Sequence, residues 1–195
     1  MSKTLVAVLL LFAAHLSSAA EMTYASEITM TSDVLNAERQ LFIRTPEGYS
    51  PNKATYPVLY VLHGQWDTLA TVATLDVLGN EIPGFIVVGI QSKGPELHPT
   101  TEPSPFAQFI QQEVRPLVAN NYSIANFQIL SGHSNAGRFV LNWWLEDGSA
   151  FSRFFAFSPS IENGEFAKAV NQLPSDLLAK KAPLVLTIAN EGKHI

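Results

Sequence analysis

The residues QILSGHSNAG, numbered 128–137, join an apolar run of strand character to a serine flanked by small residues. The chain continues as RFVLNWWL, residues 138–145, which is typical of a helix. Where a strand turns into a helix within a few residues, side chains on either side of the apex would collide, so Gly132 and Ala136 have to be small. A strained backbone at the apex lifts its side chain clear of the sheet. The stretch therefore predicts a nucleophile elbow in which Ser134 is the nucleophile.

The pentamer alone is weak evidence, because G-x-S-x-G-like strings occur by chance and Ala136 here takes the position of the last glycine. Its context supports it, since it lies between a predicted strand and a predicted helix, as the motif requires. His133 and Gly137 complete the motif. We expect the ring of His133, like that of His63 in a second motif turn upstream, to be packed rather than to act in catalysis.

A second signature lies upstream, where YPVLYVL at residues 56–62 is almost continuously apolar, as in a parallel strand covered on both faces. This run leads directly into His63, Gly64 and Gln65. Backbone N–H groups in the loop after such a strand can point at the oxyanion that forms when a serine attacks a carbonyl. We expect the N–H of Gln65 and the N–H of Asn135 to be the two donors, with Gly64 allowing close backbone approach. The alternative is that His63 and Gly64 form only a strand-ending turn.

Other strand and helix patterns alternate along the chain. Residues 28–31 and 39–45 alternate apolar and polar side chains, as in an antiparallel pair at a sheet edge. Further strands are predicted at 84–90, 151–157 and 183–189, and further helices at 68–80, from Ser104 and Pro105 onward, and at 165–172. Pro116 predicts a kink or a break in the helix that Ser104 caps. The alternation predicts an α/β fold, a three-layer α/β/α sandwich with its motif turns at the carboxyl ends of strands.

The composition fits one compact domain, because 195 residues of which 47% are hydrophobic suffice for a sizeable core. The net charge of −5 argues against nucleic acid as a partner. The sequence contains no cysteine, which excludes a disulfide framework and a thiolate metal site. The oligomeric state is left open by these properties.

Residues 1–20 have the pattern of a cleaved signal peptide. Lys3 supplies the positive charge, residues 5–14 form an apolar segment too short to span a bilayer, and Ser18, Ala19 and Ala20 offer a small-x-small cleavage site. An uncleaved anchor or a core helix is the alternative. We expect a domain of residues 21–195 that is exported to the periplasm or the medium and keeps no membrane anchor after cleavage.

Five motifs together carry a family resemblance: YPVLYVLHGQ (56–65), IVVGI (86–90), FAQFIQQEV (106–114), LSGHSNAG (130–137) and FSRFFAFSPS (151–160). From about residue 38 to residue 188 the chain resembles the putative-esterase (esterase D-like) family of α/β-hydrolases. This family includes enterochelin esterase-like and feruloyl esterase-like enzymes and is related to mycolyltransferases. The resemblance implies an α/β-hydrolase fold, hydrolysis of a small-molecule carboxyl ester without a metal or an organic cofactor, and Ser134 as the nucleophile. Ala136 stands where the family more often has glycine, a change that the elbow should tolerate.

The catalytic triad of α/β-hydrolases follows the chain order serine, acid, histidine. Glu191, just after the strand predicted at 183–189, fits the acid, the alternative being a solvated loop glutamate. The histidine should follow a further helix and strand, yet only four residues come after Glu191. His194 is too close to Glu191 in sequence, whereas His98 remains possible on geometry but has no motif around it. We therefore expect a fragment that stops before its last helix and strand, lacks its general base and is nearly inactive alone.

Two other functions stay open at the level of sequence. An acyltransferase would use the same acyl-enzyme with an alcohol in place of water, and a non-catalytic binding protein would keep the fold without the base. His98, Thr100 and Thr101 lie in a loop that leaves the carboxyl end of a strand, where substrate contacts are common. They could equally be solvated loop residues.

Overall fold

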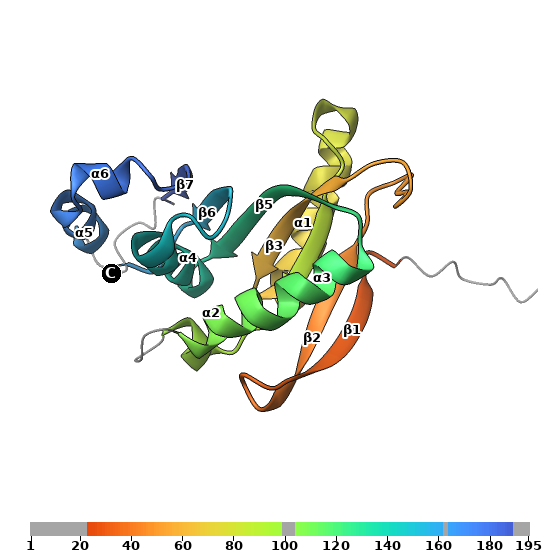
Figure 1. The fold of residues 1–195 in the computed structure, drawn as a ribbon, viewed down its shortest axis with the longest axis horizontal. Helices are drawn as coiled ribbons and strands as arrows, with labels where there is room; N and C mark the ends of the chain where they lie inside the picture. Colours follow the sequence, from red (N-terminus) through yellow and green to blue (C-terminus); the bar gives the residue numbers. More distant parts are fainter. Residues whose placement is uncertain (1–22, 99–103, 162–163, 189–195) are drawn as a thin grey trace, which may run out of the picture.

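The computed structural model describes residues 23–98, 104–161 and 164–188, and within these ranges the chain forms a mixed seven-stranded sheet with helices on both faces (Figure 1). The strands are β1 (Ser26–Ser32), β2 (Ala37–Arg44), β3 (Tyr56–Leu62), β4 (Ile86–Ile90), β5 (Ile124–His133), β6 (Arg153–Phe157) and β7 (Leu184–Thr187). Their order in the sheet is β1-β2-β4-β3-β5-β6-β7. β1 pairs antiparallel with β2, and β2 pairs antiparallel with β4. The other five strands, β3 to β7, run parallel to one another. An α/β fold is therefore confirmed.

The helices connect the parallel strands. The α-helices are α1 (Gly64–Leu78), α2 (Pro105–Phe109), α3 (Arg115–Asn121), α4 (Asn135–Asp147), α5 (Glu165–Gln172) and α6 (Ser175–Leu178). Two short 3₁₀ turns, η1 (Gly79–Glu81) and η2 (Gly94–Leu97), and a π-helical turn, η3 (Ile110–Val114), complete the set.

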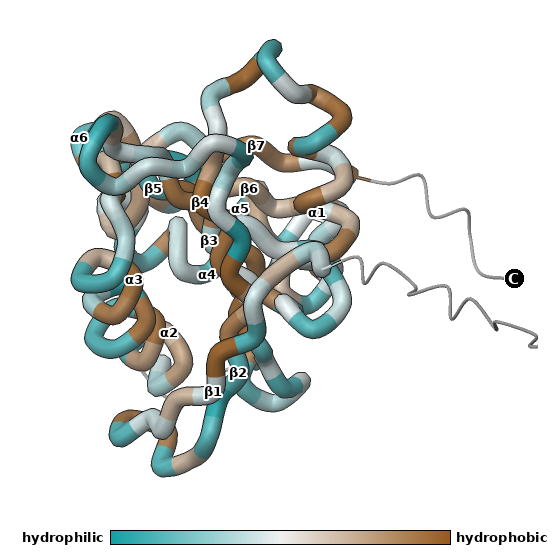
Figure 2. Tube along the Cα trace, turned by 90° about the vertical axis from the view of Figure 1, so that its right-hand side faces the viewer, coloured by the Kyte–Doolittle hydropathy of each residue, from teal (hydrophilic) through white to brown (hydrophobic). Residues whose placement is uncertain are grey.

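Alternate residues of each strand divide the core into two layers. Val58, Tyr60 and Leu62 of β3 point into a large cluster that also contains the apolar faces of α2, α3 and α4. Leu59 and Val61 of the same strand belong to a smaller cluster on the other face, where α1 packs through Val72. The hydrophobic parts of the chain run along β3, β4 and β5 in the interior (Figure 2). The parallel strands are therefore buried on both faces, as their continuous apolar runs predicted.

The run from α2 through η3 to α3 shows how the chain accommodates a proline within a helix. The hydroxyl of Ser104 accepts a hydrogen bond from the N–H of Ala107 at 3.3 Å, which confirms Ser104 as the N-cap. Pro116 does not end the helix; instead the turn before it widens to π geometry at η3. A wider turn suits a proline because the proline lacks an N–H and its ring crowds the preceding turn.

Most element positions agree with the sequence-based predictions; most differences lie at element ends, and one short helix was not predicted. β3 and α5 have the predicted bounds. α1 begins at Gly64, directly after the strand, rather than at Thr68, because the HG turn itself forms the start of the helix. β6 begins at Arg153, two residues later than predicted, and α6 was not anticipated.

Candidate active site

Ser134 occupies the sharp turn between β5 and α4. Its backbone has φ 55° and ψ −120°, a conformation that a residue other than glycine adopts only under strain. A Cβ atom on Gly132 would lie 2.5 Å from the backbone carbon and oxygen of Ala136 and 3.0 Å from its Cβ atom. Gly132 and Ala136 therefore face each other across the turn, as the predicted collision requires. The Ser134 side chain remains partly exposed at the apex.

Phe157 at the end of β6 and residues 158–160 after it, called the strap below, are joined to this turn by three hydrogen bonds. The N–H of Ser134 donates to the carbonyl oxygen of Phe157 at 3.0 Å, and the N–H of Ser160 donates to the carbonyl oxygen of Ser134 at 3.0 Å. A Cβ atom on Gly137 would lie 3.1 Å from both the Phe157 oxygen and the Pro159 Cα atom. The absence of a side chain at Gly137 thus lets the strap approach α4.

The third hydrogen bond joins two side chains, because the hydroxyl oxygens of Ser134 and Ser160 lie 3.0 Å apart. Ser160 is exposed, so both hydroxyls lie at the surface of the turn. Sequence analysis did not single out Ser160. The motif FSPS does place a small polar residue after a predicted strand, but only the structure shows that this strand pairs with the elbow strand.

The turn after β3 is held by contacts with the loop after β4. A Cβ atom on Gly64 would overlap the backbone of Gly89 and Ile90, so the glycine is required by strand β4. The side-chain amide of Gln65 donates to the carbonyl oxygen of Ser92 at 2.8 Å and accepts from the N–H of Ser92 at 3.3 Å. The Ser92 hydroxyl accepts from the N–H of His63 at 3.2 Å. His63 itself has φ 56° and precedes the first residue of α1.

The two predicted oxyanion donors follow neighbouring strands at equivalent positions. Val61 of β3 pairs with Ser131 of β5, and Gln65 and Asn135 each lie four residues beyond this pair. Both belong to the first turn of a helix, α1 or α4, where backbone N–H groups have no acceptor within the helix. The fold thus brings the start of α1 and the start of α4 to the same edge of the sheet, with their N–H groups available to an anion.

Three titratable side chains interact beside the two turns. Burial lowers the pKa of His63 below its usual value; nearby Asp67 opposes this effect and His133 adds to it. Burial raises the pKa of Asp67, which His63 and His133 partly offset. The ring of His63 lies against that of Trp66, with centroids 5.1 Å apart. His133 is exposed, so the expectation of a packed ring is wrong, because this residue ends β5 just beyond the stretch 130–132 that is buried on both faces.

Some predicted residues lie outside the described ranges. These are Glu191, His194, Thr100, Thr101 and the signal peptide of residues 1–20. His98 is described, and it is exposed after η2. Within the described ranges no group of three or more histidine, aspartate or glutamate side chains is arranged to hold a metal ion. Over the same ranges no helix is long and apolar enough to cross a membrane.

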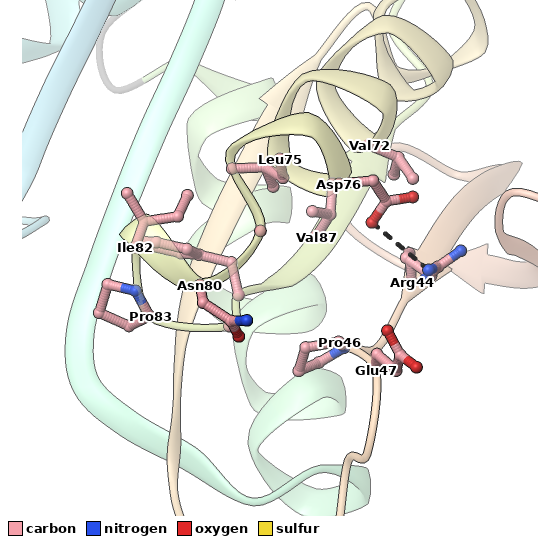
Figure 3. A pocket seen from close by; sticks show the side chains of 13 residues that line it. Arg44, Pro46, Glu47, Val72, Leu75, Asp76, Asn80, Ile82, Pro83 and Val87 are labelled. Atoms are coloured by element: carbon pink, nitrogen blue, oxygen red, sulfur yellow. Dashed lines mark ion pairs between the residues drawn. The ribbon is translucent and has the colours of Figure 1, made fainter.

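A pocket of about 450 Å³ lies away from the elbow, at the amino end of β4 (Figure 3). Its wall includes Val72 and Leu75 of α1, and its rim carries an ion pair between Arg44 and Asp76, whose charged atoms are 3.5 Å apart. The elbow lies at the carboxyl ends of the parallel strands, so this pocket is at the opposite end of the sheet from Ser134.

Solved structures share this fold. The chain aligns with the BES protein from Bacillus cereus at 25% identity and a TM-score of 0.70, covering 87% of this chain and 75% of that one. It aligns with an IroE-like serine hydrolase from Shewanella oneidensis at 23% identity and a TM-score of 0.68, covering 76% of this chain and 55% of the other. The siderophore hydrolase EstA from Aspergillus nidulans aligns at 19% identity and a TM-score of 0.72, covering 88% of this chain and 71% of that one.

The chain thus spans only 55% of the length of the Shewanella hydrolase. No curated protein matches it. The family described as "Putative esterase" matches residues 32–178, which include β2 to β6, both motif turns and the strap after β6. Because this match covers most of the sequence and the fold agrees with the esterases of known structure, the chain belongs to the esterase family of that description, within the α/β-hydrolase fold.

Proposed function

We propose that the chain forms the nucleophile-bearing part of an exported serine esterase that cleaves carboxyl esters through an acyl-enzyme on Ser134. The observation that supports this proposal most directly is the strained conformation of Ser134, at φ 55° and ψ −120°, between β5 and α4. Such strain persists where the surrounding structure fixes it and where function requires it. Gly132, Ala136 and the strap after β6 supply that surrounding structure.

In the proposed reaction, Ser134 Oγ attacks the ester carbonyl carbon and gives its proton to a histidine. The oxyanion accepts hydrogen bonds from the backbone N–H groups of Gln65 and Asn135. In the part of the chain that the structure describes, Ser134 Oγ forms a hydrogen bond with the hydroxyl of Ser160 and with no histidine. We place the general base, and the acid Glu191 that would orient it, outside the described residues.

The test compares wild type with Ser134→Ala, using both the 195-residue chain and the longest polypeptide that its gene encodes. In the longest polypeptide, wild type should react covalently with a fluorophosphonate at Ser134 and release p-nitrophenol from p-nitrophenyl acetate, and the 195-residue chain should do both more slowly. Ser134→Ala should do neither, because the nucleophile is absent. Hydrolysis that survives in Ser134→Ala would refute the proposal.

The same assay distinguishes an esterase from an acyltransferase, and a panel of substrates identifies the class of ester that is cleaved. A competing sugar alcohol should leave free acid as the main product, and a dominant transfer product would identify a transferase. Siderophore esters belong in the substrate panel, because hydrolysis of siderophores is the activity by which the Aspergillus nidulans proteins EstA and EstB are named. Fractionation of cells that express the gene would test export, with the esterase expected in the periplasm or the medium.

A further inference from the structure

The Ser160 hydroxyl touches the atom on which the proposed reaction depends. Its oxygen lies 3.0 Å from Ser134 Oγ, and either hydroxyl can be the donor. A histidine base would take the proton of Ser134, so during attack only Ser160 can donate in this pair. The geometry therefore allows the Ser160 hydroxyl to donate a hydrogen bond to Ser134 Oγ and so to stabilise negative charge on that oxygen.

Backbone hydrogen bonds fix where Ser160 lies relative to Ser134. The N–H of Ser160 donates to the carbonyl oxygen of Ser134, and the N–H of Ser134 donates to the carbonyl oxygen of Phe157, both at 3.0 Å. Between them Ser158 has φ 41°, a left-handed conformation that reverses the chain over the elbow. The N–H of Ser158 donates to the carbonyl oxygen of Thr187 at 2.9 Å, which ties the strap to β7. Two strands thus hold the backbone of Ser160 beside the nucleophile.

We propose that Ser160 is a second catalytic serine, whose hydroxyl donates a hydrogen bond to Ser134 Oγ during acylation and deacylation. This inference rests on the proposed function of Ser134. In acylation the base takes the Ser134 proton, Oγ bonds to the carbonyl carbon, and collapse of the oxyanion expels the alcohol, which receives the proton from the base. In deacylation water loses a proton to the base and adds to the acyl carbon. Ser134 Oγ then leaves with its electron pair and recovers a proton from the base.

Ser160 keeps its own proton throughout both steps. Its donated bond strengthens whenever charge develops on Ser134 Oγ, because hydrogen bonds to charged oxygens are stronger than those between neutral groups. The bond is therefore worth more in the transition states than in the ground state, which is the condition for accelerating a reaction.

The experiment compares Ser160→Ala with Ser160→Thr in the longest polypeptide that the gene encodes, with p-nitrophenyl acetate as substrate. Ser160→Ala should lower kcat and kcat/KM together by about 10-fold to 100-fold and leave KM unchanged, because the lost interaction is made in the transition state. Ser160→Thr keeps a hydroxyl and should restore most of the rate. The melting temperature of both variants should match that of wild type, since Ser160 is exposed.

Ser149→Ala is the matched control, because Ser149 is also an exposed serine and donates to Asp147 Oδ1 at 2.7 Å, beyond the end of α4. It should leave all kinetic constants unchanged. Wild-type kinetics in Ser160→Ala would overturn the inference, and so would a raised KM that threonine does not rescue, since that result describes a structural role. Activity in Ser134→Ala, or a wild type that neither turns over nor reacts with a fluorophosphonate, would overturn the proposed function and this inference with it.

Discussion

Gly132 and Gly137 differ in how much space a side chain would find. A Cβ atom on Gly132 would meet backbone atoms of Ala136 at 2.5 Å, whereas the nearest atoms to one on Gly137 lie at 3.1 Å. Gly132→Ala should therefore lower the free energy of unfolding by about 1–3 kcal/mol through overpacking. It should also slow fluorophosphonate labelling of Ser134 by about 10-fold to 100-fold, because the apex moves.

Gly137→Ala serves as the comparison. Its tight contacts are offset by the better helix propensity of alanine, so the free energy of unfolding should stay within about 1 kcal/mol of wild type. Urea denaturation and the rate of labelling measure both variants. Equal losses of unfolding free energy and of labelling rate in Gly132→Ala and Gly137→Ala would contradict the inference that crowding at Gly132 determines the shape of the elbow.

The left-handed residue His63 makes a pH dependence testable. Because burial lowers its pKa below 6.5, the folded protein binds fewer protons at this site than the unfolded chain does near that pH. Its contribution to stability is therefore present above about pH 6.5 and is lost as the pH falls below that value. His63→Asn, which tolerates the same backbone conformation, should flatten the fall in unfolding free energy between pH 7 and about pH 5.

Urea denaturation at a series of pH values measures this effect. His98→Asn removes an exposed histidine after η2 and is the control. A His63→Asn profile that parallels the wild-type profile, or one that steepens, would show that His63 does not titrate with folding as described.

At the scale of residues, sequence reasoning identified what depends on local sterics. Gly132 and Ala136 were assigned from the crowding of one turn, and their contacts across that turn agree. Ser160 could not be assigned in this way, because it reaches Ser134 only through the parallel pairing of β6 with β5. The exposure of His133 was missed for a related reason: the helices and neighbouring strands that bury β5 stop covering it after Gly132, which the local sequence does not show.

At the scale of elements, the π turn η3 anchors the hairpin between β1 and β2. Glu113 Oε1 accepts hydrogen bonds from the N–H groups of Asp33 and Val34, each at 2.9 Å. Glu113→Ala should lower the free energy of unfolding by about 1.5–3 kcal/mol, since hydrogen bonds to a charged acceptor are lost. Glu113→Gln keeps an acceptor oxygen and should cost less. Urea denaturation distinguishes the two variants.

Glu165→Ala, at an exposed position in α5, should change the free energy of unfolding by no more than about 0.5 kcal/mol. Fluorophosphonate labelling of Ser134 should be unchanged in Glu113→Ala, because the hairpin lies at the far edge of the sheet. Indistinguishable stabilities of the Glu113→Ala and Glu113→Gln variants would rule out the anchoring role.

The ends of a helix or strand could be predicted where turn-forming residues interrupt the periodic pattern of apolar side chains. Turn-forming residues bound β3, and α5 lies between Gly164 and Pro174, so both were predicted with their observed ends. Pro116 was a less reliable signal. Its local effect predicts a kink or a break, but burial of Ile110, Val114 and Val118 in the core keeps the helical run intact around it.

At the scale of the whole molecule, the two faces of the sheet are unequally packed. Leu130 and Ile129 are neighbours on β5, but Leu130 belongs to the large cluster and Ile129 to the small cluster under α1. On the α1 side, Phe127, Phe157 and Val185 remain 39%, 37% and 43% exposed. Leu130→Ala should therefore destabilise the protein more than Ile129→Ala does, by about 3–5 against about 2 kcal/mol.

Thermal or urea denaturation of the two variants measures this asymmetry. Both substitutions remove a similar number of carbon atoms from one strand, so each acts as the control for the other. A larger loss in Ile129→Ala would mean that the face under α1 contributes more to stability than its burial indicates.

The three-layer arrangement was predictable because strand and helix patterns alternate along the chain. The strand order β1-β2-β4-β3-β5-β6-β7 was not, because alternation of apolar residues tells which strands are buried and not which strands are neighbours. The neighbour relation is set by long-range pairing, and it alone decides that the turns after β3, β5 and β6 meet.

The pairing of Val61 with Ser131 joins residues about 70 positions apart, so the surroundings of Ser134 do not exist until a slow, non-local step has taken place. A chain that has formed its helices and hairpin but has not docked β5 beside β3 would carry an ordinary, unreactive serine. The time at which Ser134 starts to react with a fluorophosphonate during refolding therefore reports when β5 pairs with β3.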